Sequence, residues 1–582
     1  MLPFFYNFIS MLRTLLLLLL VAPSLSHAQW STSCDTLTND RRILSSLDSI
    51  DYVSGDLPTS LEGGRSLLSY EGWSLQRFRN DYIGLRSDNR LHYRRMKFSS
   101  LPVLSFNYSF GGQNSQFMDA QYVHAFNDSL TLNIDFQRRS GLGFLRNTSF
   151  RNNRIRLMLD HKGERYSLQL RAAYLNDSLV HSGGVQDDSI VVSLGLEFAP
   201  VFKQSASSNR QDVDVYARNY FAIVARDAQL GLFTRHRYQL INRRFFESDN
   251  LSSIYSNIYY DSTQTVDEFN LASIENSAGI YFNKGRIDFN ATIGHRYWEL
   301  RSKGPLSDTS EVDINASLVW FGKKLKLSDD LYFNFAGAYN GIRNRATIQY
   351  AVRGFDGAAQ LEFAALPPSP YQRSLFANNY RFDNKNVNLQ TSILLRSHLS
   401  YQLNGNYSIR ARLNHLATSG VYHINDSLWE QSTESIQLIQ AGVEAKMHWG
   451  GLHFYPRFVY TIGNSNSIPE MQVYARLFYK AKLFEAKKLE VLFGVDGSFS
   501  SDYELRTYSA VMDAYRWDGA LALASPMANA HAFMAMEIAA FRFYARFENV
   551  GYFWNSSAIQ EISAYPIAGQ RVRLGVTWDF VN

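Results

Sequence analysis

The segment Ser129–Gln137, which reads Ser-Leu-Thr-Leu-Asn-Ile-Asp-Phe-Gln, alternates strictly between polar and apolar side chains. Successive side chains of a β-strand point to opposite faces, so this segment has one apolar face and one polar face. The same alternation recurs in four further segments, at 165–174, 287–296, 488–498 and 571–580. The sequence therefore predicts an all-β protein built from two-faced strands.

Short polar turns join many of these strands in pairs. Asn, Asp, Gly and Ser adopt the backbone conformations that tight hairpins need, and they predict turns at 127–128, 161–164, 283–285, 327–330 and 450–451. Longer polar stretches separate the pairs, at 176–188, 242–275, 299–311, 365–385 and 418–433. Short turns that alternate with long loops are typical of outer-membrane β-barrels.

The composition agrees with a barrel. Aromatic residues make up 14% of the chain, and the mean hydropathy is negative. After residue 28 no stretch reaches the ~18 continuous apolar residues that a membrane helix needs. In a barrel, lipid-facing and lumen-facing residues alternate, so the average hydropathy stays low. The single Cys excludes an internal disulfide framework, and a diffuse net charge of +5 gives no reason to expect nucleic-acid binding.

A soluble all-β protein, such as a tandem sandwich or a propeller, is the alternative reading. Three features weigh against it. The polar faces carry few lysines, and the last strand is amphipathic. Aromatic residues also recur at strand ends, as interfacial girdles require, at Phe117, Tyr122, Phe126, Tyr166, Tyr174, Tyr297, Trp298 and Tyr479.

The final strand has one apolar face with aromatic residues near its end. Trp578 and Phe580 lie on this face, which resembles the C-terminal signal that outer-membrane assembly machinery reads. The chain runs two residues past Phe580, which is a mild departure from that signal.

The order of segments predicts export and one large domain. Residues 1–28 contain an apolar run and the small-residue site Ser26-His27-Ala28, so we predict a cleaved signal peptide, with translation starting at Met1 or Met11. Residues 29–102 are predicted to form an N-terminal periplasmic extension or a small plug. Residues 103–582 are predicted to form a single large antiparallel transmembrane β-barrel in the cell outer membrane. Its expected size is roughly 16 to 22 strands, with about 18 as the best single value.

No catalytic motif is present, so we expect neither enzymatic activity nor a cofactor. The chain has no G-x-S-x-G, H-E-x-x-H or P-loop sequence, and His448 and His453 are interpreted as loop residues beside a Gly-Gly turn rather than metal ligands. Interest moves to arginines that alternate with apolar neighbours and are candidates for the lumen wall: Arg154, Arg156, Arg171, Arg235, Arg237, Arg410, Arg412, Arg571 and Arg573.

Two readings of these arginines remain open. As a ladder that lines the pore they would favour anions, because rings of arginine set charge selectivity. As internal ion pairs with Asp288, Glu490, Asp496 and Glu548 they would contribute no net field. Ion selectivity measured in planar bilayers distinguishes the two.

Several blocks of the sequence resemble the family of putative porins common in Bacteroidetes. The matching blocks are Tyr93–Lys97 through Gly111-Gly112-Gln113, Ser140–Phe144, Arg154–Tyr174, Asn176–Gly184, His236-Arg237-Tyr238 with Phe245-Phe246, the Tyr-rich 255–260, Tyr371–Tyr380 with Asn378-Asn379-Tyr380, and Arg571–Phe580. The resemblance implies an outer-membrane barrel that is classed as a porin by its architecture, with no catalytic residues to transfer.

The leading functional hypothesis is a porin that lets small hydrophilic solutes diffuse through a polar lumen. The alternatives are a plugged substrate-specific outer-membrane transporter and a structural component of an envelope secretion or gliding machinery. A TonB-dependent receptor is disfavoured, because only about 74 residues, 29–102, precede the first expected strand. The expected partners are outer-membrane lipid, the assembly machinery and small solutes but no nucleic acid, and a homo-oligomer is allowed.

Overall fold

The chain is described by a computed structural model. The described residues are 101–581, except for 226–228, 338–339, 384–387, 426–427, 485–487, 517–522 and 554–559. The predicted signal peptide and almost all of the segment 29–102 lie outside the described residues.

Twenty-two strands form one antiparallel sheet that closes on itself, because the first strand pairs with the last. This confirms the predicted all-β barrel, although the best single value of about 18 strands is too low. The barrel strands are β1 (Val103–Gly111), β2 (Ser115–Asn127), β3 (Leu130–Gly141), β4 (Phe150–Lys162), β5 (Tyr166–His181), β6 (Ala206–Ala225), β7 (Gln229–Glu247), β8 (Thr265–Lys284), β9 (Ile287–Arg301), β10 (Ser307–Phe321), β11 (Leu325–Ala336), β12 (Gly341–Val352), β13 (Phe355–Leu366), β16 (Gln390–Asn404), β17 (Tyr407–Ser419), β20 (Ile436–Trp449), β21 (Leu452–Gly463), β22 (Met471–Leu483), β23 (Leu489–Ser500), β28 (Met527–Ile538), β29 (Phe541–Glu548) and β32 (Arg571–Val581).

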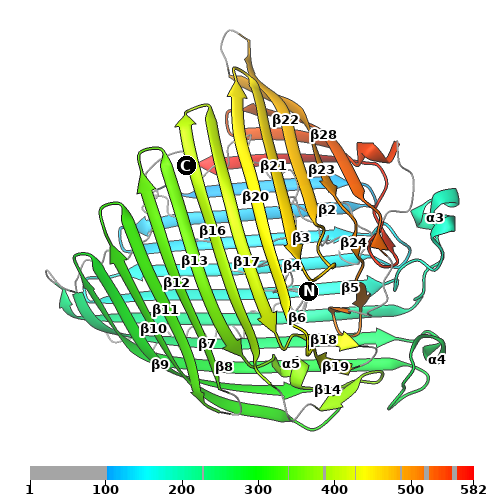
Figure 1. Ribbon diagram of the computed structural model, residues 1–582, viewed down its shortest axis with the longest axis horizontal. Helices are drawn as coiled ribbons and strands as arrows, with labels where there is room; N and C mark the ends of the chain where they lie inside the picture. Colours follow the sequence, from blue (N-terminus) through cyan, green and yellow to red (C-terminus); the bar gives the residue numbers. More distant parts are fainter. Residues whose placement is uncertain are drawn as a thin grey trace.

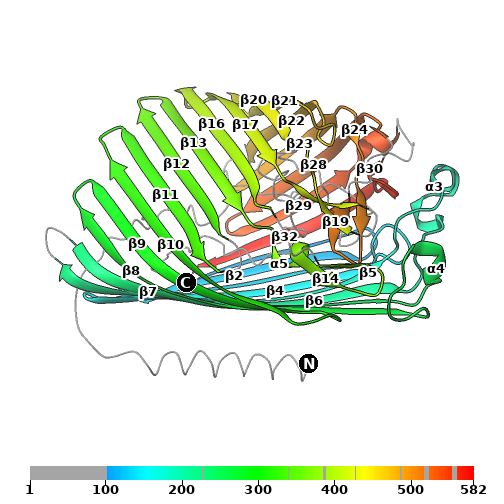
Figure 2. The ribbon, with the colours of Figure 1, turned by 60° about the horizontal axis from the view of Figure 1, so that its bottom comes forward.

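Shorter elements lie in the loops at one end of the barrel, which we call the loop end. Figures 1 and 2 show α3 and α4 at this end, while β14, β19 and α5 lie between opposing parts of the wall. No helix among the described residues is long and apolar enough to cross a membrane. The loop elements are α3 (Asp188–Leu194), η4 (Leu196–Phe198), α4 (Leu251–Ile254), α5 (Pro370–Arg373), β14 (Ser374–Phe376), β15 (Arg381–Asp383), β18 (Tyr422–Asn425), β19 (Leu428–Gln431), β24 (Tyr503–Glu504), β25 (Thr507–Ser509), β26 (Ala514–Arg516), β27 (Leu523–Ala524), η5 (Val550–Phe553), β30 (Gln560–Ile562) and β31 (Tyr565–Pro566).

Alternation along each strand separates a polar lumen from an apolar outer surface. In β3 the side chains of Thr131, Asn133 and Asp135 point inward and are buried. On the outer face Ile293 of β9 and Leu413 of β17 stay exposed. Exposed apolar side chains on a closed barrel form the surface that faces lipid.

Exposed aromatic residues on the outer surface flank this apolar belt. Near the short turns they include Trp449, Tyr479 and Trp578, and nearer the loop end they include Phe333 and Tyr460. Two of the aromatic residues predicted for the girdle do not belong to it.

Phe117 and Trp298 point into the barrel and are buried, and their inclusion in the girdle was wrong. Phe117 lies on the lumen-facing side of β2, and Trp298 lies on the lumen-facing side of β9. Both therefore share a face with polar lumen residues.

The two ends of the barrel differ in their connections. At the turn end, two or three residues join β2 to β3, β4 to β5, β8 to β9 and β20 to β21. At the loop end, connections such as 182–205 and 501–526 are long. Because these turns are short, more of the chain is available for strands, and the barrel has more strands than the best single value of about 18.

Two predicted connections were placed wrongly. Residues 327–330 lie inside β11, and the turn before that strand is at 322–324. Half of the predicted loop at 242–275 is strand, because β7 runs to Glu247 and β8 begins at Thr265.

We expect Leu413→Arg to destabilise the barrel by about 2–4 kcal/mol, because it places a charge on the lipid face near the middle of the apolar belt. The side chain of Leu413 is 48% exposed. Asn414→Arg is the matched control, because Asn414 points into the lumen, where its amide lies 3.5 Å from Gln440 Oε1. Urea unfolding in lipid vesicles measures both variants, and an equal loss in both would contradict the assignment of the outer face.

Candidate functional site

The inward face of the barrel becomes apolar near the loop end. Phe245 of β7, Phe269 of β8 and Trp298 of β9 point inward there and are buried. On another part of the wall, Leu394 of β16 and Leu416 of β17 do the same. Apolar side chains facing a water-filled lumen would be costly, so these two wall patches require a covering.

Loop residues cover both patches. We use the word cap for the described parts of the loops that pack there, which are 142–149, 182–205, 367–383, 420–425, 428–435, 464–470, 501–516 and 560–570. The first patch packs against Leu375, Ala377, Tyr380, Phe382, Tyr422, Ala510, Val511 and Met512. The second packs against Leu145, Val185, Val191, Val201, Val421, Ile468, Tyr503, Leu505, Ile562 and Tyr565. The cap therefore has two apolar cores, each anchored on the inner wall.

One hairpin of the cap reaches across the mouth. Strands β25 and β26 pair and carry the tip 510–513. They belong to the loop between β23 and β28, yet the tip packs against β6, β7 and β8. Strands β29, β32 and β1 to β5 separate β28 from β6 around the barrel. The hairpin therefore docks on a distant part of the wall.

Two arginines of the wall hold this tip. Arg243 of β7 donates hydrogen bonds to the backbone carbonyls of Ala510 and Val511. Arg210 of β6 lies 3.7 Å from the carboxylate of Asp513. All four residues of the tip are buried, so the hairpin is packed against the wall.

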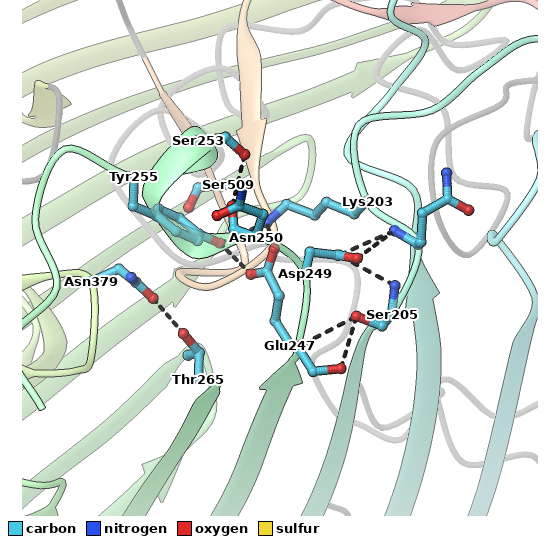
Figure 3. Close-up of polar contacts among 12 residues, drawn as sticks. Lys203, Ser205, Glu247, Asp249, Asn250, Ser253, Tyr255, Thr265, Asn379 and Ser509 are labelled. Atoms are coloured by element: carbon cyan, nitrogen blue, oxygen red, sulfur yellow. Dashed lines mark hydrogen bonds and ion pairs between the residues drawn. The ribbon is translucent and has the colours of Figure 1, made fainter. Parts of the chain in front are cut away.

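A buried polar cluster ties the loop 182–205 to β7 (Figure 3). Lys203 Nζ lies 2.6 Å from Glu247 Oε1 and 2.6 Å from the hydroxyl of Tyr255. Tyr255 also donates to Glu247. Burial, followed by the neighbouring Glu247 carboxylate, raises the pKa of Tyr255 well above its usual range, so this hydroxyl remains a donor. A charged group in such a site needs its partners, because an unpaired buried charge is costly.

The Asn378-Asn379 pair ties the cap segment 367–383 to the connection between β7 and β8. The side chain of Asn378 donates to the carbonyl of Asp261 at 2.8 Å and accepts from the N–H of Tyr260 at 3.0 Å. Asn379 accepts from the hydroxyl of Thr265 at 2.7 Å (Figure 3). Both asparagines are buried, so the short polar motif clamps the cap to the β7–β8 connection.

All nine arginines proposed for the lumen wall lie on inward faces of their strands. The register of the sheet places them beside other inward residues, with Arg154 and Arg156 on β4, Arg171 on β5, Arg235 and Arg237 on β7, Arg410 and Arg412 on β17, and Arg571 and Arg573 on β32. They do not form one cluster, because these strands are spread around the wall.

Several of these arginines have carboxylate partners. Arg237 pairs with Asp214 at 2.8 Å. Arg410 and Arg412 both lie 3.0 Å from Glu444. Internal ion pairs therefore offset part of the positive charge of the lumen.

Near β32 the ion pairs form a network. Glu548 binds Arg571, and its Oε1 lies 3.2 Å from Arg573. Asp496 lies 2.9 Å from Arg546 and 3.3 Å from Arg476. Of the four carboxylates expected to pair with the nine arginines, Glu548 does so, whereas the partners of Asp496 are arginines outside that set. Glu490 pairs instead with Lys480, and Asp288 accepts a hydrogen bond from Asn283.

The two histidines beside the Gly-Gly turn lie at strand ends rather than in a loop. His448 of β20 and His453 of β21 point inward as a pair, and His453 stacks on Phe478 with ring centroids 4.5 Å apart. Among the described residues, no three or more His, Cys, Asp or Glu side chains gather where they could hold a metal ion.

The residues that build the cap were not predicted from the sequence. One signal of the cap is the apolar run Ala510-Val511-Met512, which lies between strands and does not alternate. A second signal is that Phe245 and Phe269 fall on the lumen-facing side of their strands. A lumen wall exposed to water would carry polar residues at these positions.

A closed antiparallel barrel with an apolar outer belt and a charged lumen defines an outer-membrane β-barrel of the channel and transporter class. The chain belongs to the family described as "Putative porin", which matches residues 85–582. A search among curated proteins finds no match.

Solved structures share the fold. The copper transporter OprC aligns with a TM-score of 0.62 and 9% identity over 83% of this chain and 81% of that one. The FrpB iron transporter from Neisseria meningitidis aligns with a TM-score of 0.59 and 9% identity over 83% of each chain. The siderophore receptor PirA from Acinetobacter baumannii gives 0.59 and 9% over 84% and 81%. At this identity the likeness concerns the fold alone.

Proposed function

We propose that the protein is a gated, solute-specific outer-membrane transporter, and that the cap closes its mouth between transport events. The observation that carries this proposal is the docking of the β25–β26 hairpin on the opposite wall, where Val511 and Met512 are buried. An open diffusion pore gains nothing from a mouth filled by two apolar cores. A transporter that must recognise its solute benefits from a filled mouth, because closure excludes other molecules until the cap moves.

The proteins with similar folds also favour a solute-specific transporter over an open diffusion pore. By their names, those proteins transport iron or copper or receive siderophores. We carry over only the general class, a barrel that serves a particular small solute. The identity of the solute is not carried over, and no catalytic step is part of the proposal.

A passive porin is the second candidate, because the description of the family favours it. The two candidates differ in the resting state of the mouth. A porin requires a continuous aqueous path, whereas the proposed transporter requires a cap that stays closed without its solute.

Recording from the full-length mature chain in planar bilayers tests the proposal. We expect wild-type barrels to stay closed at moderate voltage, with only rare and brief openings. Steady conductance steps of reproducible size in the wild type would overturn the gated transporter and establish an open porin. Heat-modifiable migration in gels provides the check that the barrel has folded.

A further inference from the structure

We propose that a recess in the lumen wall, formed by β5 to β12, binds a small solute that carries a carboxylate or phosphate group. This inference deepens the proposed function and rests on it. The recess has a volume of about 410 Å³ and opens to the lumen. Its lining includes Arg171, Arg235, Arg343, Tyr216 and Tyr332.

The recess keeps an excess of positive charge. Five arginines line it, Arg171, Arg235, Arg237, Arg296 and Arg343, against the carboxylates of Glu275 and Asp313. Glu275 is engaged by Arg296 at 2.8 Å, and Arg237 is engaged by Asp214. Within the described part of the chain, no carboxylate lies within 4.0 Å of the guanidinium groups of Arg235 and Arg343.

These two guanidinium groups lie on aromatic rings instead. Arg235 lies 4.8 Å from the ring centroid of Phe233, and Arg343 lies 5.7 Å from that of Tyr332. A ring supports a guanidinium without using its N–H donors. Both side chains are therefore positioned, and their N–H groups are available to an oxyanion.

The depth of the recess depends on a missing side chain. A Cβ atom at Gly294 would lie 3.0 Å from the carboxylate of Asp313. Any other residue at this position would fill the space or displace Asp313. The inner wall therefore has a real hollow beside Arg235 and Arg343 rather than a flat charged surface.

The chemistry of the donors selects the ligand class. Guanidinium groups bind carboxylate and phosphate oxygens in a two-pronged geometry that ammonium groups cannot match. Tyr216 and Tyr332 add flat faces and hydroxyl groups, which suit a small hydroxylated solute better than a bare inorganic ion. The expected ligand is a small sugar acid or sugar phosphate.

The position of the recess fits a route through the cap. Strand β7 carries Arg243, which holds the hairpin tip, and Arg235, which lines the recess, on the same inward face. A solute that passes a displaced hairpin would reach the recess further along the same wall.

Equilibrium binding to the purified full-length mature chain in detergent tests this inference without any transport measurement. The probes are glucuronate, glucose 6-phosphate, inorganic phosphate and glucose, measured by calorimetry at low salt. We expect saturable binding of one or both sugar anions, much weaker binding of inorganic phosphate, and none of glucose.

Arg235→Ala and Arg343→Ala should each weaken that binding by at least about ten-fold, because each removes a charged donor. Lys326→Ala is the matched control, since Lys326 lies on the same wall outside the recess and its removal changes the lumen charge equally. Arg235→Lys should recover only part of the affinity.

Three results would overturn the recess as a site: no saturable binding of either sugar anion, an equal loss in Lys326→Ala, or equal binding of glucose. Any of these would leave the gated transporter intact, because gating is measured separately in bilayers. Conversely, an open wild-type pore with intact anion binding would overturn the gate and keep the site.

Discussion

Deletion of residues 507–516, with a short Gly-Ser linker in their place, is expected to convert a closed barrel into a channel with steady conductance. These residues form the hairpin that crosses the mouth, and their tip packs against Phe245 and Phe269 on the far wall. No packed contact of that tip can form in the deletion variant. The measurement is single-channel recording in planar bilayers beside the wild type.

Arg243→Ala tests the same docking with one side chain. The variant loses two charge-assisted hydrogen bonds to the tip. At about 1.5 kcal/mol each, that loss should raise the open fraction by roughly 100-fold. Arg244→Ala is the matched control, because Arg244 is 61% exposed on the outer face and pairs only loosely with Glu268 at 3.6 Å.

The gating idea fails if the deletion variant folds and stays electrically silent. It also fails if Arg243→Ala and Arg244→Ala behave alike. Silence in every variant, together with co-purification of other envelope proteins, would favour a structural role in an envelope machinery.

The faces of the strands were predictable from sequence because their period is a local property. The apolar side of 571–580, with Trp578 and Phe580, points to the outer surface as its alternation indicates. Each such strand needs only its own residues and the rule that lipid and lumen lie on opposite sides.

The lengths of the longest strands were not predictable in the same way. Beyond the apolar belt, the outward positions of β7 and β8 carry polar residues, including Asn242, Arg244, Glu268 and Asn270. There the outward face is polar and the inward face carries Phe245 and Phe269 against the cap, so the usual alternation is lost although the hydrogen-bonded ladder continues. A polar strand therefore looked like a loop.

The cap escaped prediction for a different reason. Its contacts join segments that are far apart in the sequence, such as Asn378 with Asp261 and Arg243 with Val511. No local pattern encodes such pairings. The family resemblance included Asn378-Asn379-Tyr380 but assigned these residues no role. Their burial indicates a structural role in the cap.

Glu548→Ala is expected to destabilise the barrel by about 3–5 kcal/mol, the usual cost of removing one partner from a buried ion pair. Glu548 is 2% exposed and contacts Arg571 and Arg573. Its removal leaves two guanidinium groups of the closing strand without their shared carboxylate. Because β32 pairs with β1 to seal the barrel, this loss acts where closure is completed.

Glu268→Ala is the control for this prediction. Glu268 pairs with Arg244 at 3.6 Å, but both side chains are about 60% exposed, at 59% and 61%. Such an exposed pair contributes only about 0–1 kcal/mol. Urea unfolding of both variants in lipid vesicles measures the contrast. A loss below about 1 kcal/mol for Glu548→Ala would mean that water reaches Arg571 and Arg573 in the lumen and replaces the carboxylate.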